Sequence, residues 1–589
     1  MVTSVTLGTF FNVGGKTVLG GTGGSGLDTQ SLIKSLTEAK RQPIKISQDK
    51  IDLNDKKSAA LSEFQNLLNS YKSSLDALRN PPGVGNDADN VFRFRVGSVP
   101  PIASNYVNIS TSAGAAIQSY EIRDIESVAT VARQGTGTFA VANADTDVVG
   151  GGGVNFSPGE ITFNGETITI ENTDTLNIIA SKFNAVSANT KVTATVVNVG
   201  PNNFQLSFVS TVTGTSGNFD LSAATDPNGV LTNIGLTAPV DATNAKFKLN
   251  GIQIERETNT VNDVISGVTF NILQETPDAV TPYIVSVKPD TQTVQSVINR
   301  FVQDYNALKA FEAKQTKLNA DGTFGKDSLL VNNQTFLSIM NQVNSMVNSK
   351  VAGITGNNPA SLVDIGLSFI AVPGTKDTPD LTNALNVNDG QLTSALNANF
   401  DGVSKLFGFY LTSDNTNLTI FSRTNAVSVT NFTLDIDPAT KRFKATYDVG
   451  GDAVTVDLVA TPLTGGIDGY VLKGASGSAI EGLELIYAST AAAPNINVTL
   501  SQGVADRLFN AVDAAVKNDS GSLALELDDI QGFTDRLNKD IENTNKQVDV
   551  YQEQLLARFT ALEQAIARVN NLLSSLDANS TARQVAANS

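Results

Sequence analysis

The side chains that could do covalent chemistry in this chain are carboxylates and lysines. The 589 residues include no His, no Cys and no Trp. The sequence therefore lacks the most common catalytic base, the usual nucleophile–base pairs and the standard zinc ligands. A paired-carboxylate site needs two Asp or Glu side chains held close together in a cleft, and no motif points to such a pair. We therefore expect that the chain is not an enzyme and that it has no catalytic residues, no cofactor and no metal site.

Charge and hydropathy exclude two further classes of protein. Asp and Glu number 58 against 41 Lys and Arg, a net charge of −17, whereas phosphate binding needs clustered Lys and Arg. We find no apolar run long enough for a transmembrane helix and no secretory signal peptide at the N-terminus. We expect no nucleic-acid partner and no membrane insertion. The chain either stays in the cytoplasm or leaves it without a cleaved signal.

Both ends of the chain carry apolar residues at heptad spacing, which predicts helices that pair along a seam. The first set is Leu61, Phe64, Leu68, Tyr71, Leu75 and Leu78. The set near the C-terminus is Leu555, Phe559, Leu562, Ile566, Val569 and Leu573. Each stripe has two interpretations: a seam inside one chain, or a surface shared with other subunits. For the first stripe we favour core packing.

Helix signals also give the approximate limits of these segments. A helix begins at Asp28, and we expect Pro43 to interrupt it, with a second helix over 44–79. The last helical region begins at 503–509 and resumes beyond a break at 518–522. Residues 1–26 are rich in Gly and Thr and are predicted to be a flexible arm.

The middle of the chain has the period-two pattern of strands. Asn164-Gly165 and Asn250-Gly251 each separate two alternating apolar runs, which is a strong signal for a tight hairpin. Each hairpin is followed by a Thr/Asn-rich apolar segment, which we expect to be a short helix or turn. We interpret the two copies as an internal repeat, one copy inserted into the domain of the other, with Gly150 to Gly153 as a hinge or loop tip.

The sequence thus predicts an α+β multidomain protein whose terminal helices pair into a coiled-coil-like leg and a helical domain, with β-rich domains inserted between them. The expected parts are an arm and first leg helix (1–45), a helical domain (46–112 and 291–408), a β-rich domain (113–137 and 238–290), an inserted β-rich domain (138–237), an extra β-rich insertion (409–502) and the C-terminal helix and leg (503–589).

Four stretches carry a resemblance to a known family. They are SGLD at 25–28, the block that begins PGEITFNGETITI at 158, the block NAKFKLNGIQIERETNTVNDVISGVTFNI at 244–272, and the terminal helix that opens GVADRL at 503 and continues QLLARFTALE at 554–563. In this order they resemble the flagellar hook-associated protein 2 family, the cap of the bacterial flagellar filament. The family often passes fairly directly from a segment like Leu406-Phe407-Gly408 to the terminal helix, so the insertion at 409–502 is a departure of unknown role.

The resemblance implies a function and partners. The chain would leave the cell unfolded through the flagellar export channel and form a ring, with a pentamer favoured, at the distal tip of the flagellum. There it would retain exported flagellin and promote its folding and insertion into the growing filament. The implied partners are further copies of the chain, flagellin, hook-associated junction proteins, the export apparatus and an export chaperone. The C-terminal stripe would contact filament subunits or the chaperone.

Two alternatives stay open. The β-rich domains could bind host mucin or glycans, which would make the chain a surface adhesin, although the sequence lacks Trp and a sugar-binding aromatic cluster. The chain could also be another flagellar axial protein at the hook–filament junction. The repeat and the 244–272 block argue against that second alternative.

Overall fold

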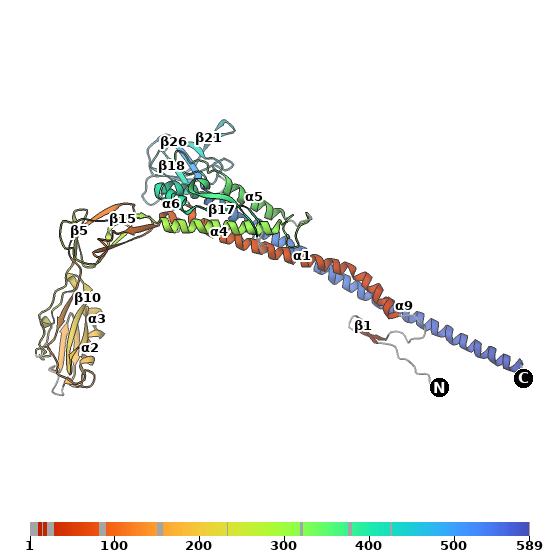
Figure 1. The fold of residues 1–589 in the computed structure, drawn as a ribbon, viewed down its shortest axis with the longest axis horizontal. Helices are drawn as coiled ribbons and strands as arrows, with labels where there is room; N and C mark the ends of the chain where they lie inside the picture. The colour runs from red at the N-terminus through yellow and green to blue at the C-terminus, as the bar shows by residue number, and fades with distance from the viewer. Residues whose placement is uncertain are drawn as a thin grey trace. The chain divides into compact units, whose positions relative to one another are not determined.

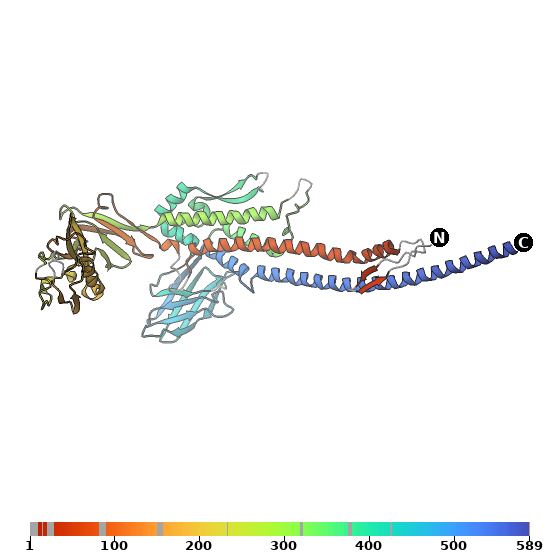
Figure 2. The same cartoon turned by 90° about the horizontal axis from the view of Figure 1, so that it is seen from below.

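The chain is an α+β multidomain protein that forms two compact units (Figures 1 and 2). Its structure is a computed structural model, which describes residues 10–13, 16–19, 29–81, 90–149, 157–232, 234–317, 322–374, 380–423 and 427–587. One unit comprises Met1–Pro82 and Val297–Ser589, and the other comprises Gly83–Ser296. The predicted SGLD stretch and the predicted hinge at Gly150 to Gly153 lie outside the described residues.

The first unit is built around long helices from both ends of the chain. Its helices are α1 (Thr29–Leu78), α4 (Thr291–Gln315), α5 (Gln334–Asn348), α6 (Asp389–Ala398), α7 (Phe400–Phe407), α8 (Val504–Val516) and α9 (Ser522–Ala587). A 3-10 turn (Leu362–Ile365) leads into the hairpin of β16 (Leu367–Val372) and β17 (Leu381–Val387). Asparagine side chains start three of the shorter helices: Asn333, Asn388 and Asn399 each accept a hydrogen bond from a backbone N–H of the first turn.

The core of this unit lies along the second half of α1. All six residues of the predicted first stripe, from Leu61 to Leu78, are completely buried. The Phe64 ring stacks on Phe311 at a centroid distance of 5.6 Å and meets the edge of Phe336 at 5.0 Å. Tyr71 stacks on Phe301 at 5.6 Å. The stripe is therefore covered by α4 and α5 of the same chain.

The first half of α1 pairs with α9, so segments from opposite ends of the sequence lie side by side (Figure 2). Asn54 donates a buried hydrogen bond of 3.0 Å to Thr534 Oγ1, and Ile33 lies in a cluster with Leu555 and Leu556. These two contacts fix an antiparallel arrangement, because the earlier residue of α1 meets the later residue of α9. The terminal helices thus pair as the sequence predicted.

The predicted interruption at Pro43 is wrong, because α1 is one continuous helix through it. A proline inside a helix removes one backbone hydrogen bond and crowds the preceding turn. Here Pro43 is exposed, so water can reach the freed carbonyl. Ile33 before it and Ile51 after it are both buried, and this packing holds the two halves in one helix.

The predicted flexible arm also contains structure. Residues Phe10–Val13 (β1) and Lys16–Leu19 (β2) form an antiparallel pair. Both segments consist mainly of aromatic and β-branched residues, which favour strands. Residues 1–9, 14–15 and 20–28 of the predicted arm lie outside the described residues.

Residues 409–502 form a β-rich body of two sheets with their own apolar core. The strands are β18 (Phe409–Ser413), β19 (Leu418–Ser422), β20 (Asn431–Asp437), β21 (Arg442–Val449), β22 (Asp452–Asp457), β23 (Val459–Pro462), β24 (Tyr470–Lys473), β25 (Glu484–Tyr487) and β26 (Ala493–Gln502). The sheet orders are β18-β26-β20-β21-β22 and β19-β25-β24-β23. Alternate residues of β20 and β21 are buried, as expected for strands with one face on a core.

The second unit contains two β-rich cores. Its strands are β3 (Arg95–Ser98), β4 (Val107–Thr111), β5 (Ser119–Ser127), β6 (Val131–Gly135), β7 (Gly159–Phe163), β8 (Glu166–Ile170), β9 (Val192–Gly200), β10 (Asn203–Thr213), β11 (Ala245–Leu249), β12 (Ile252–Arg256), β13 (Thr260–Ile265), β14 (Val268–Ile272) and β15 (Tyr283–Pro289). Helices α2 (Leu176–Ala185) and α3 (Ser187–Thr190) complete it, with 3-10 turns at Val91–Arg93, Thr215–Gly217 and Leu221–Ala223.

One core of this unit gathers residues from 103–125 and 247–287, and the other gathers residues from 132–242. The first core has the sheets β12-β11-β5-β15-β3 and β13-β14-β4, and the second has β6-β10-β9 and the β7–β8 pair. Strands β3 and β4 therefore belong to the β-rich unit and not to the helical domain predicted for 46–112. Strand β6 likewise belongs to the inserted core, earlier than the predicted start at 138.

Both Asn-Gly pairs form the tight turns that the sequence indicates. Asn164 and Gly165 have φ of 49° and 86°, and Asn250 and Gly251 have φ of 50° and 79°, as a two-residue type I′ hairpin requires. The segments that follow differ from each other. After the first hairpin comes α2, capped by Thr175. After the second comes strand β13, not the predicted helix or turn, because a turn at Gly267 supplies a partner strand, β14.

Candidate partner-binding helix

Helix α9 has a part that is buried against α1 and a part that is largely exposed. Of the predicted C-terminal stripe, Leu555 is buried and 7% exposed, and Phe559 and Ile566 are partly buried. Leu562, Val569 and Leu573 are 44%, 55% and 55% exposed. The structure therefore does not bring the six residues into one covered seam. It divides them near Phe559, the last stripe residue that packs on the cluster with Ile33 of α1.

The covered part of α9 is held by mixed contacts with the first turns of α1. Tyr551 and Phe559 pack against the cluster of Ile33, Leu555 and Leu556. Lys40 Nζ lies 5.5 Å from the centroid of the Tyr551 ring, a cation–π contact. Ile33 and Leu556 are absent from the predicted set, although the helical stripe facing a core is wide enough to include such neighbours of a heptad position.

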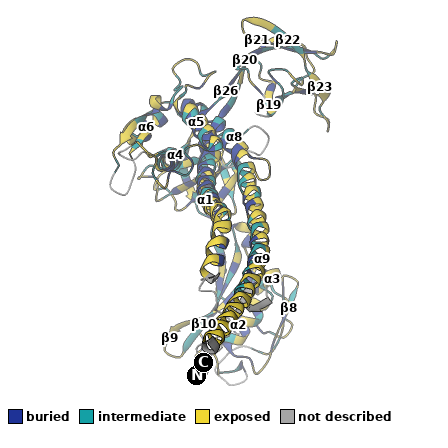
Figure 3. Ribbon diagram, turned by 90° about the vertical axis from the view of Figure 1, so that its right-hand side faces the viewer, coloured by how far each residue is buried: buried dark blue, intermediate teal, exposed yellow. Residues whose placement is uncertain are grey.

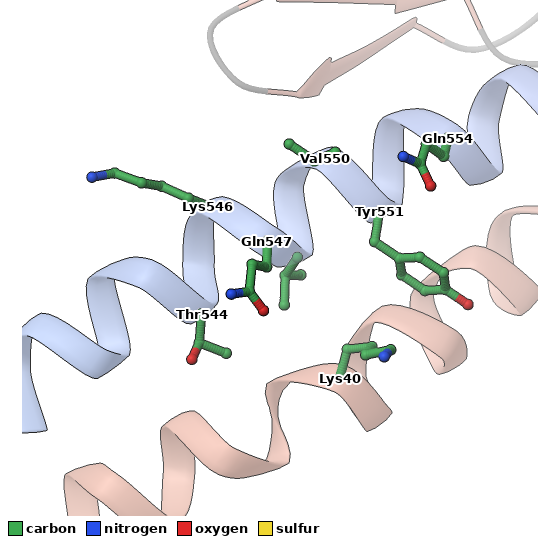
Figure 4. A pocket seen from close by; sticks show the side chains of 8 residues that line it. Lys40, Thr544, Lys546, Gln547, Val550, Tyr551 and Gln554 are labelled. Atoms are coloured by element: carbon green, nitrogen blue, oxygen red, sulfur yellow. The ribbon is translucent and has the colours of Figure 1, made fainter.

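A groove of about 440 Å³ runs beside this pairing (Figure 4). Its lining residues are Lys40, Thr544, Lys546, Gln547, Val548, Val550, Tyr551 and Gln554. All but Lys40 come from α9. Together the lining residues offer methyl groups, amides and the two ammonium groups of Lys40 and Lys546. On the same helix Lys546 donates a hydrogen bond of 2.6 Å to Glu542, which lowers the pKa of the Glu542 carboxyl. The groove suits side chains of another helix better than a small charged ligand.

Beyond Phe559, α9 is mostly exposed (Figure 3), and its sequence there carries an apolar stripe. It comprises Leu562, Ile566, Val569, Leu573 and Leu576, at alternating steps of four and three residues. Such spacing keeps the side chains on one face, where they can insert between those of a partner helix. Four of the five are more than 40% exposed. We call this set the distal stripe.

This arrangement leaves aliphatic side chains of α9 at the surface. Within the described residues, no group of three or more Asp or Glu side chains is placed to hold a metal ion. None of the helices in those parts of the chain combines the length and the apolar character needed to cross a bilayer.

Sequence reasoning missed the polar contacts that join α8 to the β-rich body at 409–502. The buried Arg423 guanidinium forms an ion pair with the buried Asp506 carboxylate and lies 4.1 Å from the centroid of the Phe409 ring. The Arg507 side chain occupies a cavity close by. No local signal could have paired residues 83 positions apart in the sequence.

Comparison with known proteins gives consistent matches. Residues 242–571 match the model of the flagellar hook-associated protein 2 C-terminus, and residues 25–132 match that of the flagellar hook-associated protein 2 N-terminus. The A-type flagellar hook-associated protein 2 of Pseudomonas aeruginosa is 26% identical over 405 residues, which are 65% of this chain and 79% of that protein. The flagellar hook-associated protein 2 of Salmonella typhimurium is 27% identical over 226 residues, 36% of this chain and 44% of that protein.

Among solved structures, the D1-D2-D3 domains of the flagellar cap protein FliD from Escherichia coli are similar to this chain at 21% identity. The match covers 59% of this chain and 89% of that one, with a TM-score of 0.41.

Proposed function

The chain belongs to the flagellar hook-associated protein 2 family, and we propose that it caps the distal tip of the bacterial flagellar filament. In this proposal several copies form a ring, with a pentamer favoured. The ring retains exported flagellin beneath it and promotes its folding and insertion into the growing filament. Each step is binding and release, so no covalent chemistry is required of the chain.

The observation that carries the proposal is the distal stripe. A helix that leaves a row of aliphatic side chains exposed loses about 25 cal/mol for each Å² of apolar surface that stays in water. Such a row is stabilised when another helix covers it. We propose that filament subunits, or an export chaperone before assembly, supply that cover. The pairing of α1 with the first part of α9 would then form the base of a leg that reaches into the filament end.

The remaining parts take complementary roles in the proposal. The β-rich unit of residues 83–296 forms the plate that closes the channel mouth. The absence of Cys from the sequence suits a chain exported unfolded through the flagellar channel, because no thiol can form stray bonds on the way. Hook-associated junction proteins are the expected neighbours before filament growth begins.

The test is a deletion strain that is complemented with variants of the distal stripe. Without the gene we expect short or absent filaments and abundant monomeric flagellin in the medium, and the intact gene should restore filaments. The variant Leu562→Gln, Val569→Gln, Leu573→Gln should fail to restore them, because Gln keeps the helix but removes the apolar face.

A matched control places the same three glutamines on the opposite face of α9. Ala567, Asn571 and Ala578 are exposed and lie about half a turn away from the distal stripe. The control Ala567→Gln, Asn571→Gln, Ala578→Gln should restore filaments fully. Normal filaments in the deletion strain, with only surface attachment lost, would reject the cap and favour an adhesin.

A further inference from the structure

Two adjoining cavities lie where the end of α5, the strand β26 and the first turns of α8 meet. One has a volume of about 320 Å³ and the other of about 180 Å³. Gln502 and Arg507 line both. The smaller cavity is closed on one side by residues 427–430 and Leu500, so the β-rich body at 409–502 forms half of its wall. Nothing in the proposed capping role uses these cavities.

The Arg507 guanidinium is the most unusual group in the cavities. It donates one hydrogen bond of 3.0 Å to Ser349 Oγ and one of 3.5 Å to the Met346 carbonyl oxygen. Its Nε–H is buried and has no acceptor. Guanidinium has five N–H donors and stays charged in proteins, and burial lowers the pKa of Arg507 from its ordinary value. This positive charge is therefore partly desolvated, and both of its acceptors in the described part of the chain are neutral oxygens.

The same region contains an arginine whose charge is neutralised. Arg423 is buried and paired with the Asp506 carboxylate, and Phe409 covers its face. Asp506 precedes Arg507 in the sequence but is paired with Arg423. Within the described residues, Arg507 has no carboxylate partner of this kind. Arg507 is partly buried. Removing a charge from water without supplying a counter-ion is costly, and an anion that enters the cavity would relieve part of that cost.

The rest of the lining favours an anion. Lys350 contributes a second positive charge at the exposed edge of the smaller cavity. Against the effect of burial, hydrogen bonds from Ala360 and Ser361 and then the charge of Lys350 lower the pKa of the Asp364 carboxyl, but no direct ion pair joins Lys350 to this carboxyl in the described part of the chain. The Thr430 hydroxyl and the Gln502 amide, both among the described residues, are also free of hydrogen-bond partners there. Among the residues that the structure describes, no Asp or Glu lines either cavity.

The size of the smaller cavity narrows the class of ligand. Pockets for typical small molecules measure about 300–1,000 Å³, and this cavity measures about 180 Å³. We propose that Arg507 and Lys350 form a carboxylate-binding site that accepts one side-chain-sized carboxylate. Arg507 binds it through charge-assisted hydrogen bonds and Lys350 acts as the second cation. The ligand is either a free dicarboxylate or an Asp or Glu side chain of a second copy of the chain. This site is independent of the capping proposal.

The chain carries a built-in reporter for the test. It contains three methionines, Met1, Met340 and Met346. Met346 lines the larger cavity, whereas Met340 is completely buried in the helical core. We would label the methionine methyl groups with carbon-13 and titrate the whole protein with succinate at constant ionic strength. The Met346 methyl signal should shift to saturation, while the Met340 signal stays in place. Succinamide, which lacks the charges, should shift neither.

Variants then assign the shift to the two cations. Lys350→Gln should weaken succinate binding by about tenfold, as expected for the loss of one charge-assisted contact. Arg507→Gln should abolish it. Because Arg507→Gln also removes two structural hydrogen bonds, the deciding variant is Lys350→Gln, whose side chain is exposed. Lys517→Gln is the matched control, because it removes an equal charge from an exposed position outside both cavities and should bind like the wild type.

A concentration series without succinate separates the two sources of carboxylate. A Met346 shift that grows with protein concentration and is lost in Lys350→Gln identifies a second copy as the ligand. A shift seen only with succinate identifies a free dicarboxylate, and both results support the site. The proposal is overturned if Met346 does not respond to either treatment, or if succinate and succinamide shift it equally in the wild type and in Lys350→Gln.

Discussion

The two apolar stripes at the ends of this chain have the same spacing in the sequence, but one is buried in the structure and the other is largely exposed. The stripe of α1 from Leu61 to Leu78 is completely buried under helices of its own chain. The distal stripe of α9 has four of its five residues more than 40% exposed. A heptad pattern therefore predicts a covered helix face, but it does not say which molecule covers it.

The composition of the two stripes gives a partial clue. The α1 stripe includes Phe64 and Tyr71, which stack on the aromatic rings of Phe311 and Phe301 from α4. The distal stripe contains only aliphatic residues and no aromatic ring. Large rings gain most from a fixed, close-packed environment. The α1 stripe therefore has a reason to be packed inside its own chain that the distal stripe lacks.

The largest effect that tests this comparison is expected from Phe64→Ala. Removing a completely buried ring that contacts Phe311 and Phe336 leaves a cavity, which should lower the free energy of unfolding of the helical unit by about 3–5 kcal/mol. The measurement is the guanidinium midpoint followed by far-UV circular dichroism. A loss below about 1 kcal/mol would mean that the α1 stripe is not the core of this unit.

An intermediate effect is expected where the two terminal helices pair. Asn54→Ala leaves the Thr534 hydroxyl buried without its partner and should cost about 1–3 kcal/mol by the same measurement. The double variant Asn54→Leu, Thr534→Val replaces both polar partners and should recover most of that loss. If Asn54→Ala leaves the free energy of unfolding unchanged, the helices do not pair in this register in the free chain.

The smallest effect is expected in the distal stripe. Leu573→Ala removes an exposed side chain and should change the free energy of unfolding of the isolated chain by less than about 0.5 kcal/mol. Leu555→Ala, at a buried position of the same helix, is the comparison and should destabilise the pairing measurably. Equal losses in the two variants would show that the distal stripe already has a partner within the chain.

Local signals in the sequence predicted the fold well where the decisive interactions are local. Asn164-Gly165 and Asn250-Gly251 fix their turns through backbone conformations that Asn and Gly adopt easily. The prediction failed where packing against a distant segment determines the local structure. Pro43 would end an isolated helix, but packing on both sides keeps α1 continuous. The segment at 260–265 is a strand because Gly267 turns the chain back onto it.

The candidate sites follow the same rule. Periodicity located the apolar face of α9 but could not locate the end of its cover at Phe559, since that depends on where α1 begins. The Arg507 cavity gave no sequence signal, because Ser349, Thr430 and Leu500 come from three distant segments. In both cases the sequence does not tell which distant residues lie against the site.

The hydrogen bond between Asn54 and Thr534 joins residues 480 positions apart. The second half of α1 finds its cover in α4 and α5, but the first half has its partner only in α9, near the end of the sequence. The β-rich bodies between the two helices combine local hairpins with pairings between distant strands, such as β3 with β15 and β18 with β26. Their strands pair with one another, so the bodies do not depend on the pairing of α1 with α9. The pairing of α1 with α9 is then a late folding event, because it requires that α9 has been synthesised. A chain truncated before α9 would leave the first half of α1 without its partner, with Ile33 no longer covered by Leu555 and Leu556.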